Sequence, residues 1–276
     1  MIFTLTGGDR MLGSIIGDII GSTYELRPVK RTDFPLFPQG SRFTDDSVLT
    51  AAVAEVLLGR NNAGQPSARS YALCYKRYYA RYPEAGFGEL FCRWAAEPRL
   101  TVLHSYGNGG AMRAAPIAFA CDTAEAVLRE ARRSCRYTHR NQEAERGAQA
   151  VALAVYLARC GVSKQELRRR IEGRFSYDLS RPLAAVRPDF LFDCRASRTV
   201  PPAIRAFLES DDYESAVRLA VSLGGDSDTL ACIAGGIAQA YYGALPPALV
   251  ARAMPLLDDG LRRTAQDFSR RFSVPC

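Results

Sequence analysis

The stretch AERGAQAVALAVYLAR, residues 144–159, decides the fold class of this 276-residue chain. Alanine, leucine and arginine are strong helix formers, and the apolar side chains of this stretch do not alternate with polar ones as in a half-buried strand. A second run of the same kind covers residues 203–222, and strand-like alternation is almost absent from the rest of the chain. The sequence therefore predicts an all-α protein.

Helical periodicity covers most of the remaining chain, in about thirteen segments overall. We expect helices at roughly 12–22, 45–59, 67–80, 88–97, 111–121, 123–135, 141–160, 163–173, 201–209, 213–223, 228–242, 247–257 and 259–271. The hydrophobic content of 47% is enough for a large core. We therefore expect a single compact orthogonal helical bundle, with residues 11–276 as one domain and residues 1–10 as an N-terminal extension.

Composition excludes several protein classes. The sequence contains no run of eighteen apolar residues, so it predicts no membrane-spanning helix. The first ten residues lack the basic and apolar regions of a secretory signal. The eight cysteines occur singly, which favours a reduced, cytoplasmic protein. The net charge of +7 comes mainly from arginines spread along the chain, because the only lysines are Lys30, Lys76 and Lys164. This spread of charge is unlike the compact basic arm of a nucleic-acid-binding protein. We also expect the protein to be a monomer.

Two acidic clusters, each at the start of an apolar helix, are the main chemical signal. They are Thr44-Asp45-Asp46 and Asp226-Ser227-Asp228-Thr229. Acidic residues in a first turn complement the helix dipole, so either cluster alone could be an N-cap. If the two clusters converge in space, their side chains offer hard oxygen ligands that suit Mg²⁺ or Mn²⁺. The predicted metal ligands are Thr44, Asp45, Asp46, Asp226, Asp228 and Thr229.

Two glycine-containing segments add to this signal. In GDIIGSTYE, residues 17–25, the four-residue spacing of Gly17 and Gly21 lets a second helix approach closely. Glu25 follows at the start of the long segment 25–43, where it is either a solvated loop residue or a functional carboxylate. In SYGNGGAMR, residues 105–113, a glycine-rich loop leads into a helix and can present backbone N–H groups to a phosphate; the alternative is a simple turn.

Taken together, these motifs resemble the ADP-ribosylglycohydrolase family. They run in order from residue 12 to about residue 243, as G-D-x-x-G-S-x-Y-E, F-T-D-D-S, R-Y-P-x-x-G-F-G, S-Y-G-N-G-G-A-M-R, T-H, T-V-P-x-A and S-L-G-G-D-S-D-T. The resemblance implies an all-α enzyme with a binuclear Mg²⁺ or Mn²⁺ centre. Its reaction would be hydrolysis of the N- or O-glycosidic bond at C1″ of ADP-ribose, which removes ADP-ribose from a modified protein side chain or another acceptor.

The resemblance also implies a role for individual residues. The six predicted ligands match the metal ligands of the family, with Asp45 and Asp46 also at the catalytic centre, and Glu25 matches a mobile catalytic glutamate. The residues that match the substrate-binding groups around the diphosphate, distal ribose and adenosine are Ser105, Tyr106, Gly107, Asn108, Gly109 and His139. The chain departs from the common bacterial pattern T-H-N-H-P-E-G, because Arg140, Asn141 and Gln142 follow His139.

Two other functions fit parts of the same pattern. A non-catalytic ADP-ribose-binding or structural protein on this fold would be expected to lose metal ligands, and this chain keeps all six. A metal phosphohydrolase that cuts the diphosphate would release AMP instead of ADP-ribose. The acceptor stays open among Arg, Ser, another side chain, a nucleic-acid end and a small molecule such as O-acetyl-ADP-ribose. The motifs at 17–25 and 105–113 are closer to the serine and O-acetyl-ADP-ribose branch than to the arginine branch.

Overall fold

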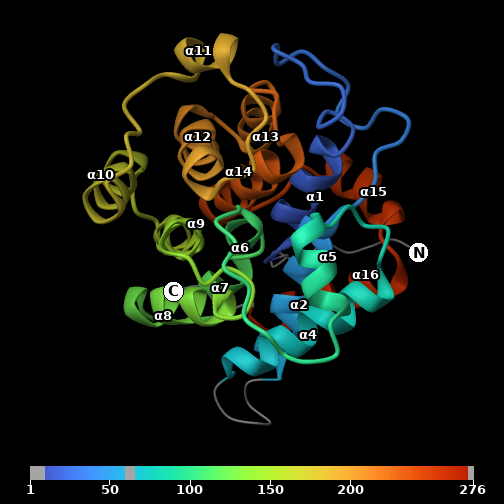
Figure 1. The fold of residues 1–276 in the computed structure, drawn as a ribbon. Helices are drawn as coiled ribbons and strands as arrows, with labels where there is room; N and C mark the ends of the chain where they lie inside the picture. The colour runs from blue at the N-terminus through green and yellow to red at the C-terminus, as the bar shows by residue number, and fades with distance from the viewer. Residues whose placement is uncertain (1–9, 60–65, 273–276) are drawn as a thin grey trace.

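The computed structural model describes residues 10–59 and 66–272, which form helices joined by loops (Figure 1). No strand occurs among these residues, so the predicted all-α bundle is confirmed. The α-helices are α1 Leu12–Gly21, α2 Asp45–Leu58, α4 Ala68–Arg81, α5 Glu89–Ala96, α6 Gly109–Met112, α7 Ala115–Ala120, α8 Ala124–Cys135, α9 Gln142–Arg159, α10 Lys164–Phe175, α11 Leu183–Val186, α12 Ala196–Glu209, α13 Tyr213–Val221, α14 Ser227–Tyr242, α15 Pro247–Ala253 and α16 Asp259–Arg271. Short 3₁₀ helices cover Arg187–Asp189 and Met254–Leu256. The expected N-terminal extension, residues 1–10, lies outside the described residues except for Arg10.

Helices α1 and α14 lie side by side in the centre of the molecule, and every residue of α1 is buried (Figure 1). Glycines allow this close packing. A Cβ atom added to Gly17 would lie 2.2 Å from the carbonyl oxygen of Ala231, and one added to Gly21 would lie 2.4 Å from that of Ser227. The expected close approach of a second helix at Gly17 and Gly21 is thus confirmed, and it places α1 directly beside the first turn of α14.

Three expected helices differ from the observed ones around proline. The segment expected as one helix at 247–257 is an α-helix only to Ala253 and continues as a 3₁₀ turn that contains Pro255. The segment expected as one helix at 111–121 is split into α6 and α7, and Pro116 stands in the first turn of α7, where its missing N–H costs nothing. Helix α12 begins at Ala196, five residues before the expected start, and keeps Pro201 and Pro202 in its interior. The carbonyl groups that these prolines leave unbonded belong to Ser197 and Arg198, which are exposed and can bond to water.

Loops bring function-bearing segments to one end of α1, α2 and α14. The loop 22–43 leaves α1 and returns to the start of α2, and the loop 222–226 leads into α14. The long segment between α10 and α12 crosses the same face and contains α11 and a 3₁₀ turn, which the sequence pattern did not predict (Figure 1). No helix in the described part of the chain is long and apolar enough to cross a bilayer.

Candidate active site

The two acidic clusters converge where the N-terminal ends of α2 and α14 meet beside α1. One carboxylate oxygen each of Asp18, Asp46 and Asp228 lies within 4.8 Å of the others. The same holds for Glu25, Asp226 and Asp228, so Asp228 is shared by the two groups. The predicted convergence of the clusters is confirmed, and the loop residue Glu25 is brought to the same place.

Asp18 is a member of this site that the sequence analysis did not single out. Its buried carboxylate accepts hydrogen bonds from the backbone N–H of Thr44 at 2.9 Å and of Ser47 at 3.1 Å. The hydroxyl of Thr44 donates to it at 2.6 Å, and the hydroxyl of Ser47 donates as well. An aspartate among isoleucines and glycines on a mostly apolar helix was the available signal, because a charge in such a place needs partners.

The oxygen atoms of the site fit a divalent cation. Oδ1 of Asp46 is buried and has no hydrogen-bond partner, while Oδ2 accepts a hydrogen bond from the Thr229 hydroxyl at 3.2 Å. None of the ion pairs among the described residues neutralises these carboxylates. Buried carboxylates are normally paired or bound to metal, and an all-oxygen donor set is the kind that Mg²⁺ and Mn²⁺ prefer.

Without a cation, the ionised forms of these buried carboxylates are unfavourable. Burial, reinforced by the neighbouring carboxylates, raises the pKa of Asp46 and of Asp228 well above the usual value of 3.8. Desolvation, with the charges of Asp18 and Asp226 adding to it, raises the pKa of Asp45 to about 8. Burial and the charge of Asp226 also raise the pKa of Glu25. A bound cation would reverse this balance and stabilise the ionised forms.

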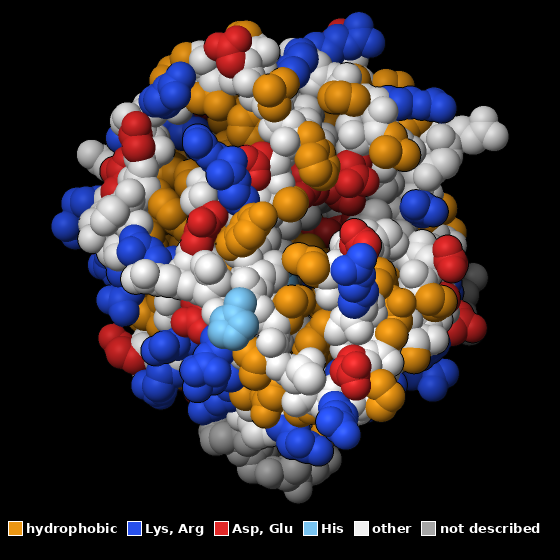
Figure 2. All heavy atoms as spheres, viewed as in Figure 1, with side chains coloured by type: hydrophobic (Ala, Val, Ile, Leu, Met, Phe, Trp, Pro, Cys, Tyr) orange, Lys and Arg blue, Asp and Glu red, His pale blue; other side chains and the backbone are white. Residues whose placement is uncertain are grey.

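A cleft of about 400 Å³ opens above the acidic site. Figure 2 shows acidic side chains inside a hollow on this face, with hydrophobic side chains around its rim. All six predicted metal ligands line the cleft, together with Glu25. The glycine-rich loop and several aromatic residues also line the cleft. Of these aromatic residues, Phe91 is buried and Phe192 is exposed.

Of the predicted substrate-binding residues, all but one line the cleft: Ser105, Gly107, Asn108, Gly109 and His139. Tyr106 is 53% exposed and does not line it. The backbone carbonyl of Tyr106 accepts a hydrogen bond from the N–H of Ala196 at 3.1 Å, and this bond fixes the loop against the start of α12. An aromatic side chain that does face the cleft is that of Phe192, for which the sequence pattern gave no signal.

Asn108 links the glycine-rich loop to the acidic site. Its side-chain amide donates to Oδ2 of Asp226 at 2.7 Å and to the hydroxyl of Thr199 at 3.0 Å. The Asn108 side chain therefore orients a predicted metal ligand. Thr199 belongs to the T-V-P-x-A motif, and its hydrogen bond with Asn108 gives the threonine of that motif a structural role.

His139 packs against the same loop as a neutral imidazole. A Cβ atom added to Gly109 would lie 3.1 Å from two atoms of the ring. Burial, together with the positive charge of Arg113, lowers the pKa of His139 well below 6.5. The Thr138 hydroxyl contacts Nδ1 of His139 at 2.9 Å and accepts a hydrogen bond from Nη2 of Arg113 at 2.7 Å. Arg113 is fully buried, its guanidinium lies 4.1 Å from the centre of the Tyr75 ring, and its Nε and Nη1 atoms have no partner.

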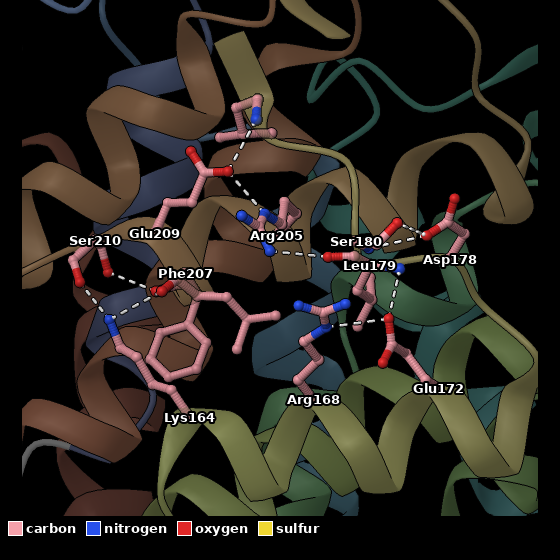
Figure 3. A network of polar contacts seen from close by, with 12 residues as sticks. Lys164, Arg168, Glu172, Asp178, Leu179, Ser180, Arg205, Phe207, Glu209 and Ser210 are labelled. Atoms are coloured by element: carbon pink, nitrogen blue, oxygen red, sulfur yellow. Dashed lines mark hydrogen bonds and ion pairs between the residues drawn. The ribbon is translucent and has the colours of Figure 1, made fainter. Parts of the chain in front are cut away.

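A second groove, of about 790 Å³, lies between α9, α12 and the segment that joins α10 to α12. Arginine side chains dominate its polar lining, and neither carboxylate group of the acidic site reaches it. Figure 3 shows its edge, where Arg205 donates to Glu209 and to the backbone of Leu179. Glu143, which follows Gln142 in the first turn of α9, lies in this groove and accepts hydrogen bonds from Ser197.

Comparisons with known proteins point to one family. The family model described as ADP-ribosylglycohydrolase matches residues 9–276. Human ADP-ribosylhydrolase ARH3 is 30% identical over 84% of this chain and 84% of its own length. ADP-ribosylarginine hydrolase Tri1 of Pseudomonas putida is 26% identical over 86% of this chain and 71% of its own length. A solved structure described as an ADP-ribosylglycohydrolase-related protein complex superposes with a TM-score of 0.71, at 29% identity, over 96% of this chain and 97% of the other.

Proposed function

This chain belongs to the ADP-ribosylglycohydrolase family and is an ADP-ribosyl hydrolase, and from that premise we propose that it cleaves the glycosidic bond at C1″ of ADP-ribose with the help of two Mg²⁺ or Mn²⁺ ions. The observation that carries the proposal is the pair of carboxylate groups that share Asp228, together with the unpartnered buried oxygen of Asp46. Thr44, Asp45, Asp46, Asp226, Asp228 and Thr229 are the proposed ligands. When bound, the cations would hold the hydroxyls of the distal ribose and stabilise negative charge that develops on oxygen.

The remaining residues of the cleft orient the substrate and move a proton. In the loop 105–109 the N–H groups of Gly107 and Asn108 already donate to the Ser105 hydroxyl and to the Cys194 carbonyl, so the other N–H groups of the loop would bind the diphosphate. His139 would hold the adenosine end as a neutral imidazole. Glu25 stands beside Asp226 and Asp228 on a loop, where its carboxylate can take a proton from the attacking water. Cleavage of a glycosidic bond passes through an oxocarbenium-like state, which the surrounding carboxylates stabilise electrostatically.

The acceptor is the part of the substrate that lies beyond C1″. We propose that the acceptor is a protein side chain. The motifs at 17–25 and 105–113, which are closer to the serine and O-acetyl-ADP-ribose branch of the family, favour a serine linkage. The test is a panel of defined substrates linked through Ser, Arg, a nucleic-acid end and O-acetyl-ADP-ribose, assayed with Mg²⁺ and with Mn²⁺ for released ADP-ribose. Preference for the Arg-linked substrate would overturn the serine proposal while leaving the glycohydrolase itself intact.

Two alternatives give other results in the same assay. A metal phosphohydrolase would release AMP. A non-catalytic ADP-ribose-binding protein would bind ADP-ribose and release nothing from any substrate. We further propose that the protein is a single-domain monomer, and that it is cytoplasmic, in keeping with cysteines that occur singly along the sequence.

A further inference from the structure

Each of the three lysines in this arginine-rich chain directs its ammonium group at backbone carbonyl oxygens. Lys76 donates to the carbonyls of Trp94, at 2.7 Å, and of Glu97, at the C-terminal end of α5. Lys164 donates to the carbonyls of Leu208, at 3.4 Å, and of Ser210, at the C-terminal end of α12 (Figure 3). An ammonium group is a compact charge with three donors on one atom, so it can bond to several carbonyls that converge on one point.

Lys30 differs from the other two because its acceptors join separate loops. Its Nζ atom donates to the carbonyl of Arg187 at 3.0 Å, of Phe190 at 2.5 Å and of Leu223 at 2.6 Å. The side chain comes from the loop 22–43, the first two acceptors lie between α11 and α12, and the third lies just before α14. All three donors of the ammonium are therefore used to hold three loops at one point.

These three loops form one wall of the proposed active-site cleft. The loop of Lys30 carries Glu25, the segment of Phe190 leads to Phe192, and the turn after Leu223 leads to Asp226; all three of these residues line the cleft. Lys30 itself does not line it. The turn is tightly fitted, because a Cβ atom added to Gly225 would lie 3.1 Å from the carbonyl oxygen of Leu191, and Gly225 has a positive φ of 77°.

We propose that Lys30 is a positioning residue, which holds Glu25, Phe192 and Asp226 in their binding arrangement before ADP-ribose arrives. The inference rests on the proposed function of the cleft. Without the ammonium group, the three loops separate part of the time, and the apparent affinity falls by the fraction of molecules that remain arranged. Once ADP-ribose is bound, its own contacts restore the arrangement. The effect of removing the ammonium group should therefore fall on KM and on the Kd of ADP-ribose, with little change in kcat.

The test uses Lys30→Met, which keeps the aliphatic stem and removes the three donors, and Lys164→Met as the matched control. Lys164 also donates to backbone carbonyls, and neither it nor its acceptors line the cleft. We expect Lys30→Met to raise the Kd of ADP-ribose, measured by calorimetry, about tenfold, which corresponds to about one tenth of the ligand-free molecules remaining arranged. Lys164→Met should lower the melting temperature and leave this Kd unchanged.

Amide hydrogen exchange on the ligand-free protein provides a readout that does not depend on the function. In Lys30→Met, exchange should become faster in 187–192 and 223–226, and in Lys164→Met it should stay the same there. If the wild type binds no ADP-ribose, the proposed function fails, and exchange alone then tests the loop contact. If the wild type binds and Lys30→Met has the same Kd and the same exchange, Lys30 has no positioning role.

Lys30→Arg keeps the positive charge and provides a second test of the proposal if Lys30→Met does not fold. The donors of arginine are spread over a planar fork and do not sit on one atom, so they fit the three converging carbonyl oxygens less well, and the Kd of this variant should still exceed that of the wild type. A wild-type Kd in Lys30→Arg, together with wild-type exchange in 187–192, would overturn the proposal.

Discussion

The hydroxyl of Thr44 donates to Oδ1 of Asp18 at 2.6 Å, so a carboxylate from α1 holds the residue that caps α2. Three further donors, the N–H of Thr44 and the N–H and hydroxyl of Ser47, converge on the other oxygen of the same carboxylate. The first turn of α2 carries Asp45 and Asp46. Asp18 therefore fixes the direction in which these two proposed ligands point.

The first prediction concerns Asp18. Asp18→Ala leaves four buried donors without their acceptor, and we expect the free energy of unfolding of the metal-loaded protein to fall by about 3 kcal/mol. Asp18→Asn keeps one carbonyl acceptor and should lose less. Urea unfolding in excess Mg²⁺ measures both variants. Equal stability of Asp18→Ala and the wild type would show that the donors find other partners.

A second prediction concerns Glu25. Glu25→Gln preserves the shape of the side chain and removes its charge and its capacity to accept a proton. We expect kcat to fall at least ~10²-fold while ADP-ribose still binds, since this is the lower end of a general acid–base contribution. Calorimetry beside single-turnover rates separates the two effects. Loss of binding in step with the rate would make Glu25 a group that mainly holds metal, and an unchanged rate would exclude it from catalysis.

The third prediction concerns pH in the metal-free protein. The pKa of Asp45 rises from 3.8 to about 8 on folding, and those of Asp46 and Asp228 also rise. At these three carboxylates the folded protein binds more protons than the unfolded chain between these values, so their contribution to stability decreases as pH rises from about 4 to 8. The lowered pKa of His139 contributes in the opposite direction as pH rises toward 6.5. Saturating Mg²⁺ should weaken or remove the decrease from the carboxylates, because the cation stabilises their ionised forms, and should leave the contribution of His139. Melting temperatures across this range, in EDTA and in Mg²⁺, provide the check; the same pH dependence in both would contradict it.

The glycine-rich loop leads to a fourth prediction. A side chain at position 109 meets the imidazole of His139 at 3.1 Å and intrudes on the backbone that would approach the diphosphate. Gly109→Val should therefore raise KM steeply in a folded variant. Gly173 in α10 is a suitable control, because it does not line the cleft and a Cβ atom added there meets nothing within 4 Å. If the KM of folded Gly109→Val equals that of Gly173→Val, the loop is only a turn.

Much of this arrangement could be predicted from the sequence, because strong periodicity and N-cap residues indicate where a helix begins and ends. Helix α2 begins after Thr44 and α14 after Asp226, as the two acidic clusters predict. The early start of α12 depended on the exposure of Ser197 and Arg198, whose carbonyl groups the prolines leave unbonded, and the local pattern does not reveal this exposure. Asp18 was missed for a related reason. Its importance comes from α2, which is packed beside it but lies far along the chain.

The roles of Tyr106 and Asn108 show the same limit at the site. Both belong to a motif whose position in the cleft could be predicted, but the direction of each side chain depends on α12. The bond from Ala196 to the Tyr106 carbonyl fixes the loop and leaves the ring half exposed, and Thr199 draws the Asn108 amide toward Asp226. Contacts between segments ninety residues apart cannot be read from either segment alone.

The central claim is that the acidic site is a metal centre that cleaves the glycosidic bond, and one measurement tests it most directly. Metal-free protein is incubated with a serine-linked ADP-ribosylated peptide, before and after addition of Mg²⁺, and the products are identified by mass. We predict ADP-ribose and unmodified peptide only after Mg²⁺ is added, and none from Asp228→Asn, which lacks the carboxylate shared by both groups. Full release by the metal-free protein, or AMP in place of ADP-ribose, would contradict the account.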